Sequence, residues 1–372
     1  MRRDRRRHED EDEEEDRKAF WKGLARDILV AAIIVAVFLG AMYAYAGVWP
    51  PLVVVESSSM QHGDLTSYVG VIDTGDMVFQ QAAPARSSVT TYLEGRNTCP
   101  PTSSNCGYMT YGDYGDVIIF RTGRPTPVIH RAIMYVQFHT NGTADVSDVA
   151  LLPDSEWAAF RNATPTRVPA FIDTLTVRHM GFERNINLTL TFCTRSPNPP
   201  YPCRSNFPGV GERAGYVTAG DNNVFHTCSL SRSACPSGYD SLWIARLQDV
   251  QGRARGEIPW LGLLKLTLSP SETCCARGWG DPEAPKNSWD SLVVVLLLLL
   301  ALPFIIEYAG RGWAKYVAPR LPEIAWPWRR RKRPPGDRAE ETVEADGEND
   351  PDNLDDLDDP DEPPPREGSF EP

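Results

Sequence analysis

The sequence predicts a mainly β domain held between two transmembrane helices, one near each end of the chain. Residues 28–48 and 289–309 are apolar enough to cross a bilayer. Between them, short β-branched runs alternate with Gly-Asp turns, and no long amphipathic helix is evident. These observations indicate a β-rich outer domain that is attached to a membrane at both of its ends.

The first span, residues 28–48, carries no charge and follows a highly charged N-terminal segment, residues 1–27. At about 1.5 Å per residue, such a helix covers the roughly 30 Å hydrocarbon core of a bilayer. A cleavable signal peptide is the alternative, because Ala44-Tyr45-Ala46 resembles a small-residue cleavage site. The apolar run is longer than a usual signal-peptide core and its flank is crowded with acids, which favours an uncleaved anchor.

The second span, residues 289–309, reaches full length only if Trp289 and Tyr308 mark the two membrane interfaces. Pro303 lies within it and predicts a kink or an early end of the helix. A basic and aromatic segment, residues 310–333, follows and is expected to lie at the inner membrane surface.

The distribution of basic residues predicts the orientation of the chain. Lysines and arginines flank the first span on its N-terminal side and the second on its C-terminal side. By the positive-inside rule, both termini are cytoplasmic and residues 49–288 lie outside, as in a multi-pass protein of the plasma membrane. Three glycosylation sequons, which begin at Asn141, Asn162 and Asn187, fall in that outer part.

All eight cysteines also fall in the outer part, and their spacing favours disulfides formed in an oxidising compartment. Neighbour pairing is the simplest of about 105 possible connectivities. A zinc site is the rival explanation, but the spacings are wider than usual for zinc and no histidine pair accompanies them. The neighbouring cysteines are Cys99 and Cys106, Cys193 and Cys203, Cys228 and Cys235, and Cys274 and Cys275.

The acidic character of the chain lies in its tails. The formal net charge is −12, yet the residues after 336 alone carry 16 acidic residues against two arginines. The segment 334–372 is rich in acids and proline and poor in aromatics, so we expect disorder there. Without the tails the chain is nearly neutral, and it lacks the basic face that a nucleic-acid partner requires.

The outer domain, residues 49–288, is predicted to consist of short strands around a small core. Gly-Asp turns at 75–76 and 115–116 each launch an apolar strand. Two polar stretches, at about 82–114 and 139–212, are interpreted as coil-like insertions. The predicted strands are 52–55, 69–72, 77–79, 117–120, 128–133, 216–217, 243–246 and 261–268.

Three residues of the outer domain have side chains suited to nucleophilic chemistry. Ser59 follows two serines shortly after the first span, His130 ends an apolar run, and Asp221 lies in a Gly-Asp-Asn turn. Each has an ordinary explanation on its own: a polar loop, a strand histidine and a turn aspartate. Together they supply a hydroxyl, a general base that can take its proton, and a carboxylate that can orient the base.

Four motifs in this order behind an N-terminal anchor resemble the type I signal peptidases. The resemblance is to the archaeal and endoplasmic-reticulum branch, in which a histidine stands in the place of the bacterial lysine. The matched motifs cover a minority of the chain and are specific only together. They are Ser57-x-Ser59-Met60, Gly115-Asp116-Val117-Ile118-Ile119-Phe120, Pro127-Val128-Ile129-His130-Arg131 and Gly220-Asp221-Asn222-Asn223.

The resemblance implies a signal-peptidase-like β fold and a membrane-bound serine endopeptidase that removes signal peptides from secreted preproteins. It implies Ser59 as nucleophile, His130 as general base and Asp221 as supporting carboxylate. The Ser57 hydroxyl and the Ser59 N–H would bind the oxyanion. No cofactor and no metal are implied. The expected partners are signal peptides, the lipid bilayer and the secretion translocon, and residues 258–262 are expected to rest on lipid headgroups.

The sequence departs from this family at one acid and in its size. A second aspartate usually follows the first by six positions, but here that position is Thr227. Asp240, displaced by the insertion that holds Cys228 and Cys235, is the candidate replacement acid. Two alternatives stay open: an inactive, signal-peptidase-like membrane glycoprotein that binds partners, and an unrelated surface protein in which the order of motifs is accidental.

Overall fold

The computed structural model describes most of the chain up to residue 315. The predicted acidic tail and the pair Cys99 and Cys106 lie outside the described residues. The described residues are 2–97, 107–195, 203–207, 213–228, 235, 238–240, 243–313 and 315.

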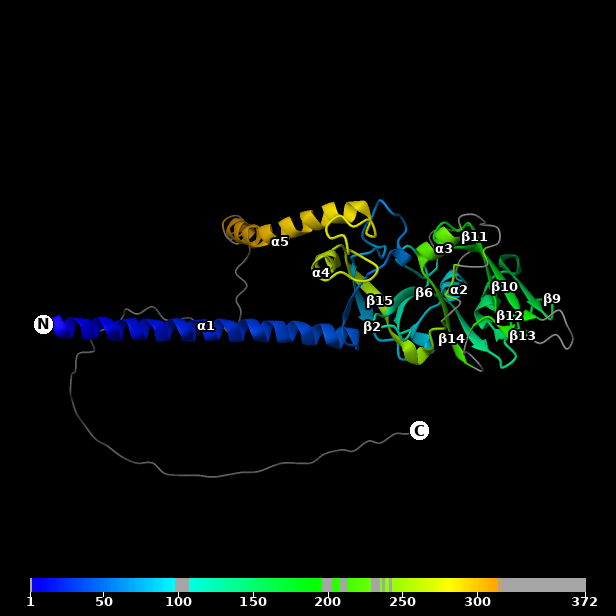
Figure 1. Cartoon of the computed structure of the whole chain (residues 1–372), viewed down its shortest axis with the longest axis horizontal. Helices are drawn as coiled ribbons and strands as arrows, with labels where there is room; N and C mark the ends of the chain where they lie inside the picture. The colour runs from blue at the N-terminus through cyan, green and yellow to red at the C-terminus, as the bar shows by residue number, and fades with distance from the viewer. Residues whose placement is uncertain are drawn as a thin grey trace, which may run out of the picture. The chain divides into compact units, whose positions relative to one another are not determined.

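Two helices are long and apolar enough to cross a membrane. Helix α1 spans Arg2–Ala46, and its apolar part is Phe20–Ala46, with a mean hydropathy of 2.5. Helix α5 spans Lys286–Gly312 and is the second of them, with a mean hydropathy of 2.7 in its apolar window against 2.5 in that of α1 (Figure 1). The predicted early end of the second span is wrong, because α5 continues past Pro303.

The described part of residues 49–288 is mainly β, as predicted, and its larger sheet is antiparallel. In this sheet the neighbouring strands follow the order β1-β2-β15-β5-β6-β14, and β7 adds to the far end of β6. Strand β6 is therefore an interior strand with β5 on one side and β14 on the other. The bounds are β1 Leu52–Val54, β2 Met77–Gln81, β5 Val117–Phe120, β6 Val128–Phe138, β7 Ala144–Asp145, β14 Ala214–Ala219 and β15 Val250–Ile258.

A second, four-stranded sheet has the order β11-β10-β8-β9 and lies beside the first (Figure 1). The prediction of a coil-like insertion at 139–212 is wrong for this part. Its strands alternate apolar and polar residues, as in the burial of Leu188 and Leu190 on one face of β11. The bounds are β8 Trp157–Arg161, β9 Thr164–Thr166, β10 Thr174–Met180 and β11 Ile186–Thr191, with two small ladders, β3 Met109–Thr110 with β4 Asp113–Tyr114 and β12 Cys193–Arg195 with β13 Cys203–Ser205.

Short helices connect the strands, and one of them replaces a predicted strand. Residues 261–268 form helix α4, Gly262–Leu268, because Leu263 and Leu266 share one helical face and pack with Trp289 and Leu292. Residues 69–72 form no strand, and Ala245 makes only an isolated bridge to Tyr216. The other short helices are η1 Ser58–Met60, η2 Arg86–Ser88, α2 Tyr92–Asn97, η3 Ser147–Leu151, η4 Asp154–Glu156, α3 Asp221–Thr227 and η5 Leu247–Asp249.

The apolar cores tie the sheets together and fix the turn η1. One core joins buried residues of β8, β10 and β11 to those of β6 and β14, so the second sheet shares its interior with the first. A smaller core holds Met60 against Val117 and Ile119 of β5. Since Met60 directly follows Ser59 and is 1% exposed, burial of its side chain anchors the end of η1 in the sheet.

The described cysteines are oxidised. Cys228 and Cys235 form a disulfide, as do the vicinal residues Cys274 and Cys275, in agreement with neighbour pairing. Cys193 is also disulfide-bonded, to a partner outside the described side chains. Within the described residues, no group of His, Cys, Asp and Glu could hold a metal ion.

Candidate active site

Ser59 lies in η1, a single 3₁₀ turn that follows the edge strand β1. Ser57 continues the extended backbone of β1, with φ −139° and ψ 158°, before the chain turns. Ser57 and Ser59 line one groove of about 500 Å³, and their hydroxyl oxygens are 3.3 Å apart. The same groove is lined by apolar residues of β1 and of the segment 126–130, and also by the charged side chains of Glu56, Arg124 and Lys265.

His130 lies on β6 and also lines this groove. Its Nδ1 is 2.6 Å from Oδ2 of Asp240, and the Thr218 hydroxyl donates to the same carboxylate oxygen at 2.6 Å. The Asp240 N–H donates to the carbonyl of Thr218 at 2.8 Å, which fixes the main chain of the aspartate as well. A carboxylate beside Nδ1 requires a proton on Nδ1, so Nε2 of the neutral ring is left as an acceptor.

Gly220 brings Ser59 and His130 to the same point. A Cβ atom added to Gly220 would lie 2.4 Å from the carbonyl oxygen of Ser59 and 3.1 Å from Nε2 of His130. The first distance is a steric clash with the main chain, so only glycine allows the chain between β14 and α3 to pass this close to η1. The glycine of the Gly220-Asp221-Asn222 motif is therefore a packing requirement of the site.

Asp221 does not hold the imidazole of His130, which corrects the expected role of this residue. Its carboxylate accepts two hydrogen bonds from Arg131, Nε to Oδ1 at 2.8 Å and Nη2 to Oδ2 at 2.6 Å. Nε2 of His62 is 3.0 Å from Oδ2. His130 and Arg131 are consecutive on β6 and point to opposite faces, so Asp221 meets the guanidinium, whereas Asp240 meets the imidazole.

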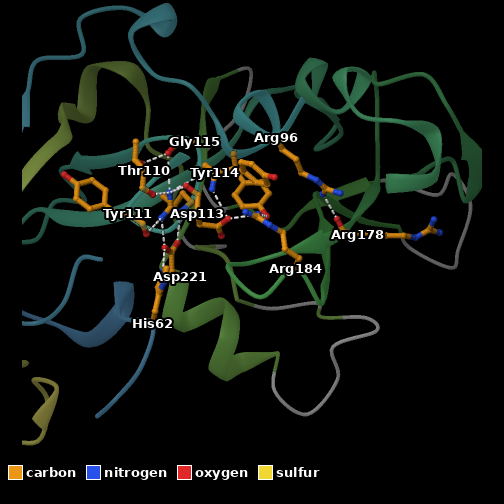
Figure 2. A network of polar contacts seen from close by, with 12 residues as sticks. His62, Arg96, Thr110, Tyr111, Asp113, Tyr114, Gly115, Arg178, Arg184 and Asp221 are labelled. Atoms are coloured by element: carbon orange, nitrogen blue, oxygen red, sulfur yellow. Dashed lines mark hydrogen bonds and ion pairs between the residues drawn. The ribbon is translucent and has the colours of Figure 1, made fainter. Parts of the chain in front are cut away.

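The charge of Asp221 is stabilised within a buried polar network. Burial raises the pKa of Asp221, but Arg131 and its hydrogen bonds lower it more, to about 2. Arg131 is 1% exposed and donates from Nη1 to the carbonyls of Thr110, Asp113 and Tyr114 at 3.0 to 3.1 Å. Figure 2 shows Asp221 between His62 and this loop. The Asp221–Arg131 pair therefore joins α3, β6 and the loop around β3 and β4.

A second cavity adjoins the first on the other side of His130. It measures about 420 Å³ and is lined by the aromatic residues Phe120, Tyr239 and Trp243, together with Asp240. His130 lines both cavities, as do Val128 and Arg124. The imidazole therefore separates an apolar groove beside Ser59 from an aromatic pocket beside Asp240.

The structure brings together Ser57, Ser59, His130 and Asp240, and it places Asp221 in the adjoining network. Sequence reasoning did not find two further residues, Asn222 and Glu283, which both contact Ser58. Asn222 belongs to the motif Gly220-Asp221-Asn222-Asn223, and this motif was the signal that could have indicated it. Glu283 had none, because 225 residues separate it from Ser58.

Comparisons with protein-family models, with curated proteins and with solved structures find no match for this chain. The functional assignment therefore depends on the side-chain geometry and on the four sequence motifs.

Proposed function

We propose that this chain is a membrane-bound serine endopeptidase that removes N-terminal signal peptides from secreted preproteins. The observation that carries the proposal is the 2.6 Å contact between Nδ1 of His130 and Asp240, in a structure where His130 and Ser59 line the same groove. A carboxylate, an imidazole and a serine hydroxyl in this order can activate the serine for acyl transfer. Asp240, and not Asp221, is the third member of this group.

The proposed reaction uses His130 first as a base and then as an acid. Nε2 of His130 takes the Ser59 proton as Oγ bonds to the substrate carbonyl carbon, and the imidazolium then protonates the leaving amine as the C–N bond breaks. Water hydrolyses the acyl-enzyme with the same base. Such acid–base assistance contributes about 10²–10⁴-fold to the rate.

Two donors are available for the negative oxygen that forms on the substrate carbonyl. The Ser57 hydroxyl lies 3.3 Å from Oγ of Ser59 in the groove, and the Ser59 N–H belongs to the same turn. Among the described residues, no hydrogen bond joins Ser59 to His130, and such contacts commonly tighten only when substrate binds. One oxyanion donor lowers the activation barrier by about 3 kcal/mol.

The shape of the groove supports an extended, apolar substrate. Strand β1 is the edge of the larger sheet and also lines the groove, so a peptide in extended form can add to that edge. Val53 and Val54 present half-buried, branched side chains there, which leave room for small residues before the cleaved bond. This is the substrate class that the family resemblance implies.

The two candidate membrane helices support action at a membrane surface. Strand β1 begins at Leu52, soon after α1 ends at Ala46, so the groove is tethered close to the end of a span. A tether of this length raises the effective concentration of enzyme beside membrane-inserted preproteins without further contacts. We propose that the groove faces the outer side of the plasma membrane, as the positive-inside rule indicates.

Cleavage of a membrane-inserted preprotein by the full chain in liposomes tests this function. We expect cleavage by the wild type and losses of more than about 10³-fold for Ser59→Ala and for His130→Ala. Ser87→Ala, at an exposed serine of η2, is the matched control and should cleave as the wild type does. Equal cleavage by all variants would exclude these catalytic roles, and a folded wild type without cleavage would favour the inactive, partner-binding alternative.

A further inference from the structure

Ser58, the residue before the proposed nucleophile, is held by two residues from distant parts of the chain. Oε1 of Glu283 accepts the Ser58 N–H at 3.1 Å and the Ser58 hydroxyl at 2.7 Å. Nδ2 of Asn222 donates to the Ser58 carbonyl at 2.9 Å, and the Gln61 N–H donates to the same oxygen at 3.1 Å. The main-chain N–H and C=O of Ser58 are therefore both fixed.

These contacts determine which way the Ser59 N–H points. The Ser58 carbonyl and the Ser59 N–H belong to one planar, trans peptide group, so they point in opposite directions. Because Asn222 holds the carbonyl on one side, the N–H is turned to the other. Within the described part of the chain, the Ser59 N–H donates to no protein atom, and Ser59 itself lines the groove. This N–H is thus free to bind a substrate oxygen.

We propose that Glu283 and Asn222 are positioning residues that clamp Ser58 and thereby aim the Ser59 N–H at the oxyanion. The inference rests on the peptidase function proposed above. It gives the segment between α4 and α5 a role in the active site, where the sequence alone indicated no site residue.

Glu283 is itself well supported, as a positioning residue must be. Its carbonyl accepts from Nε2 of Gln61 at 2.9 Å, and its N–H donates to Oδ1 of Asp281 at 3.1 Å. The Asp281 carbonyl in turn accepts from the indole of Trp289, in the first turns of α5, at 3.2 Å. The main chain of Glu283 is therefore tied both to the end of η1 and, through Asp281, to the start of α5.

Ser58 is an anchor in this arrangement and not a second nucleophile. Its hydroxyl is directed to Glu283, and among the three serines the groove is lined by Ser57 and Ser59. Ser57 and Ser59 thus line the groove, and Ser58 between them is held by hydrogen bonds to Glu283.

The test compares cleavage kinetics of the full chain in liposomes for wild type, Glu283→Ala, Glu283→Gln and Asn222→Ala. Glu272→Ala is the matched control, because Glu272 lies exposed in the same segment. Titration with a serine-reactive fluorophosphonate counts competent sites in each preparation. We expect kcat per titrated site to fall about 10–100-fold in Glu283→Ala and Asn222→Ala with KM unchanged. Glu283→Gln keeps an acceptor for Ser58 and should recover most of the rate.

Three results would overturn the clamp. Wild-type kcat per site in both Glu283→Ala and Asn222→Ala would show that holding Ser58 does not matter. A loss confined to the number of titrated sites, with kcat per site unchanged, would show a role in folding alone. Failure of the wild type to cleave any preprotein would remove the peptidase function and the clamp with it, whereas the first two results leave that function standing.

Discussion

Replacing Asp240 with asparagine directly tests the proposed catalytic group of Ser59, His130 and Asp240. Asparagine keeps the size of the side chain and can still accept from Nδ1 of His130 and from Thr218. What the substitution removes is the negative charge that faces the imidazolium formed during the reaction. The carboxylate oxygen is 2.6 Å from Nδ1, so this charge lies in direct contact with the ring.

The expected loss follows from that distance and from the exposure of the aspartate. Two unit charges about 4 Å apart interact by about 4 kcal/mol at an effective dielectric constant of about 20. The Asp240 side chain is 27% exposed, and water screens part of this interaction. We therefore expect about 2–4 kcal/mol, which lowers kcat by about 30-fold to about 10³-fold.

Steady-state cleavage of a preprotein gives kcat, and a thermal melt of the same sample separates catalysis from stability. We expect Asp240→Asn to melt close to the wild type, because its hydrogen-bonding pattern is largely kept. A wild-type kcat would refute the assignment of Asp240. A melting temperature lowered in proportion to the lost rate would show that Asp240 acts on folding.

Two further predictions concern the buried acids. Asp221→Asn leaves the Arg131 guanidinium buried without its counter-charge, so the free energy of unfolding in urea should fall by about 3–5 kcal/mol, and a loss below about 1 kcal/mol would contradict the proposed structural role. Burial raises the pKa of Asp73 to about 7, of Asp76 to about 6 and of Glu257 to about 7. These acids hold protons that the unfolded chain releases, so their contribution to stability is full below about pH 4 and is lost as the pH rises to about 7, by up to about 4 kcal/mol for Asp73. Asp73→Asn should flatten this fall in a pH series of thermal melts, and an unchanged slope would show that Asp73 does not bind the proton.

The sequence alone predicts those strands that consist of short apolar runs. The strands at 77–79, 117–120 and 128–133 are β-branched and buried, and the sequence predicts all three. The helix at 262–268 was missed because Lys265 and Thr267 alternate with leucines, which is the period of a strand. The sheet at 157–191 was missed because threonines alternate with its leucines and make the stretch look polar.

The candidate site was predictable only as far as its motifs reach. Ser59 and His130, which line one groove, could be singled out because both stand in motifs with a recognisable order along the chain. Asp240 follows the Cys228–Cys235 disulfide along the chain, and no spacing rule gives the position of its carboxylate. Glu283 meets Ser58 across most of the length of the chain, so this contact exists only in the folded protein.

His130 and Arg131 are neighbours on β6, but their side chains serve two different sites. Both placements depend on the register of this strand. A shift of β6 by a single position would turn the guanidinium toward the substrate and the imidazole into the interior. A chain in which β6 pairs out of register would therefore lack both His130 in the groove and the buried ion pair of Arg131 with Asp221. In the peptidase proposed here, the ability to cleave would therefore arise only once β6 has paired in its native register.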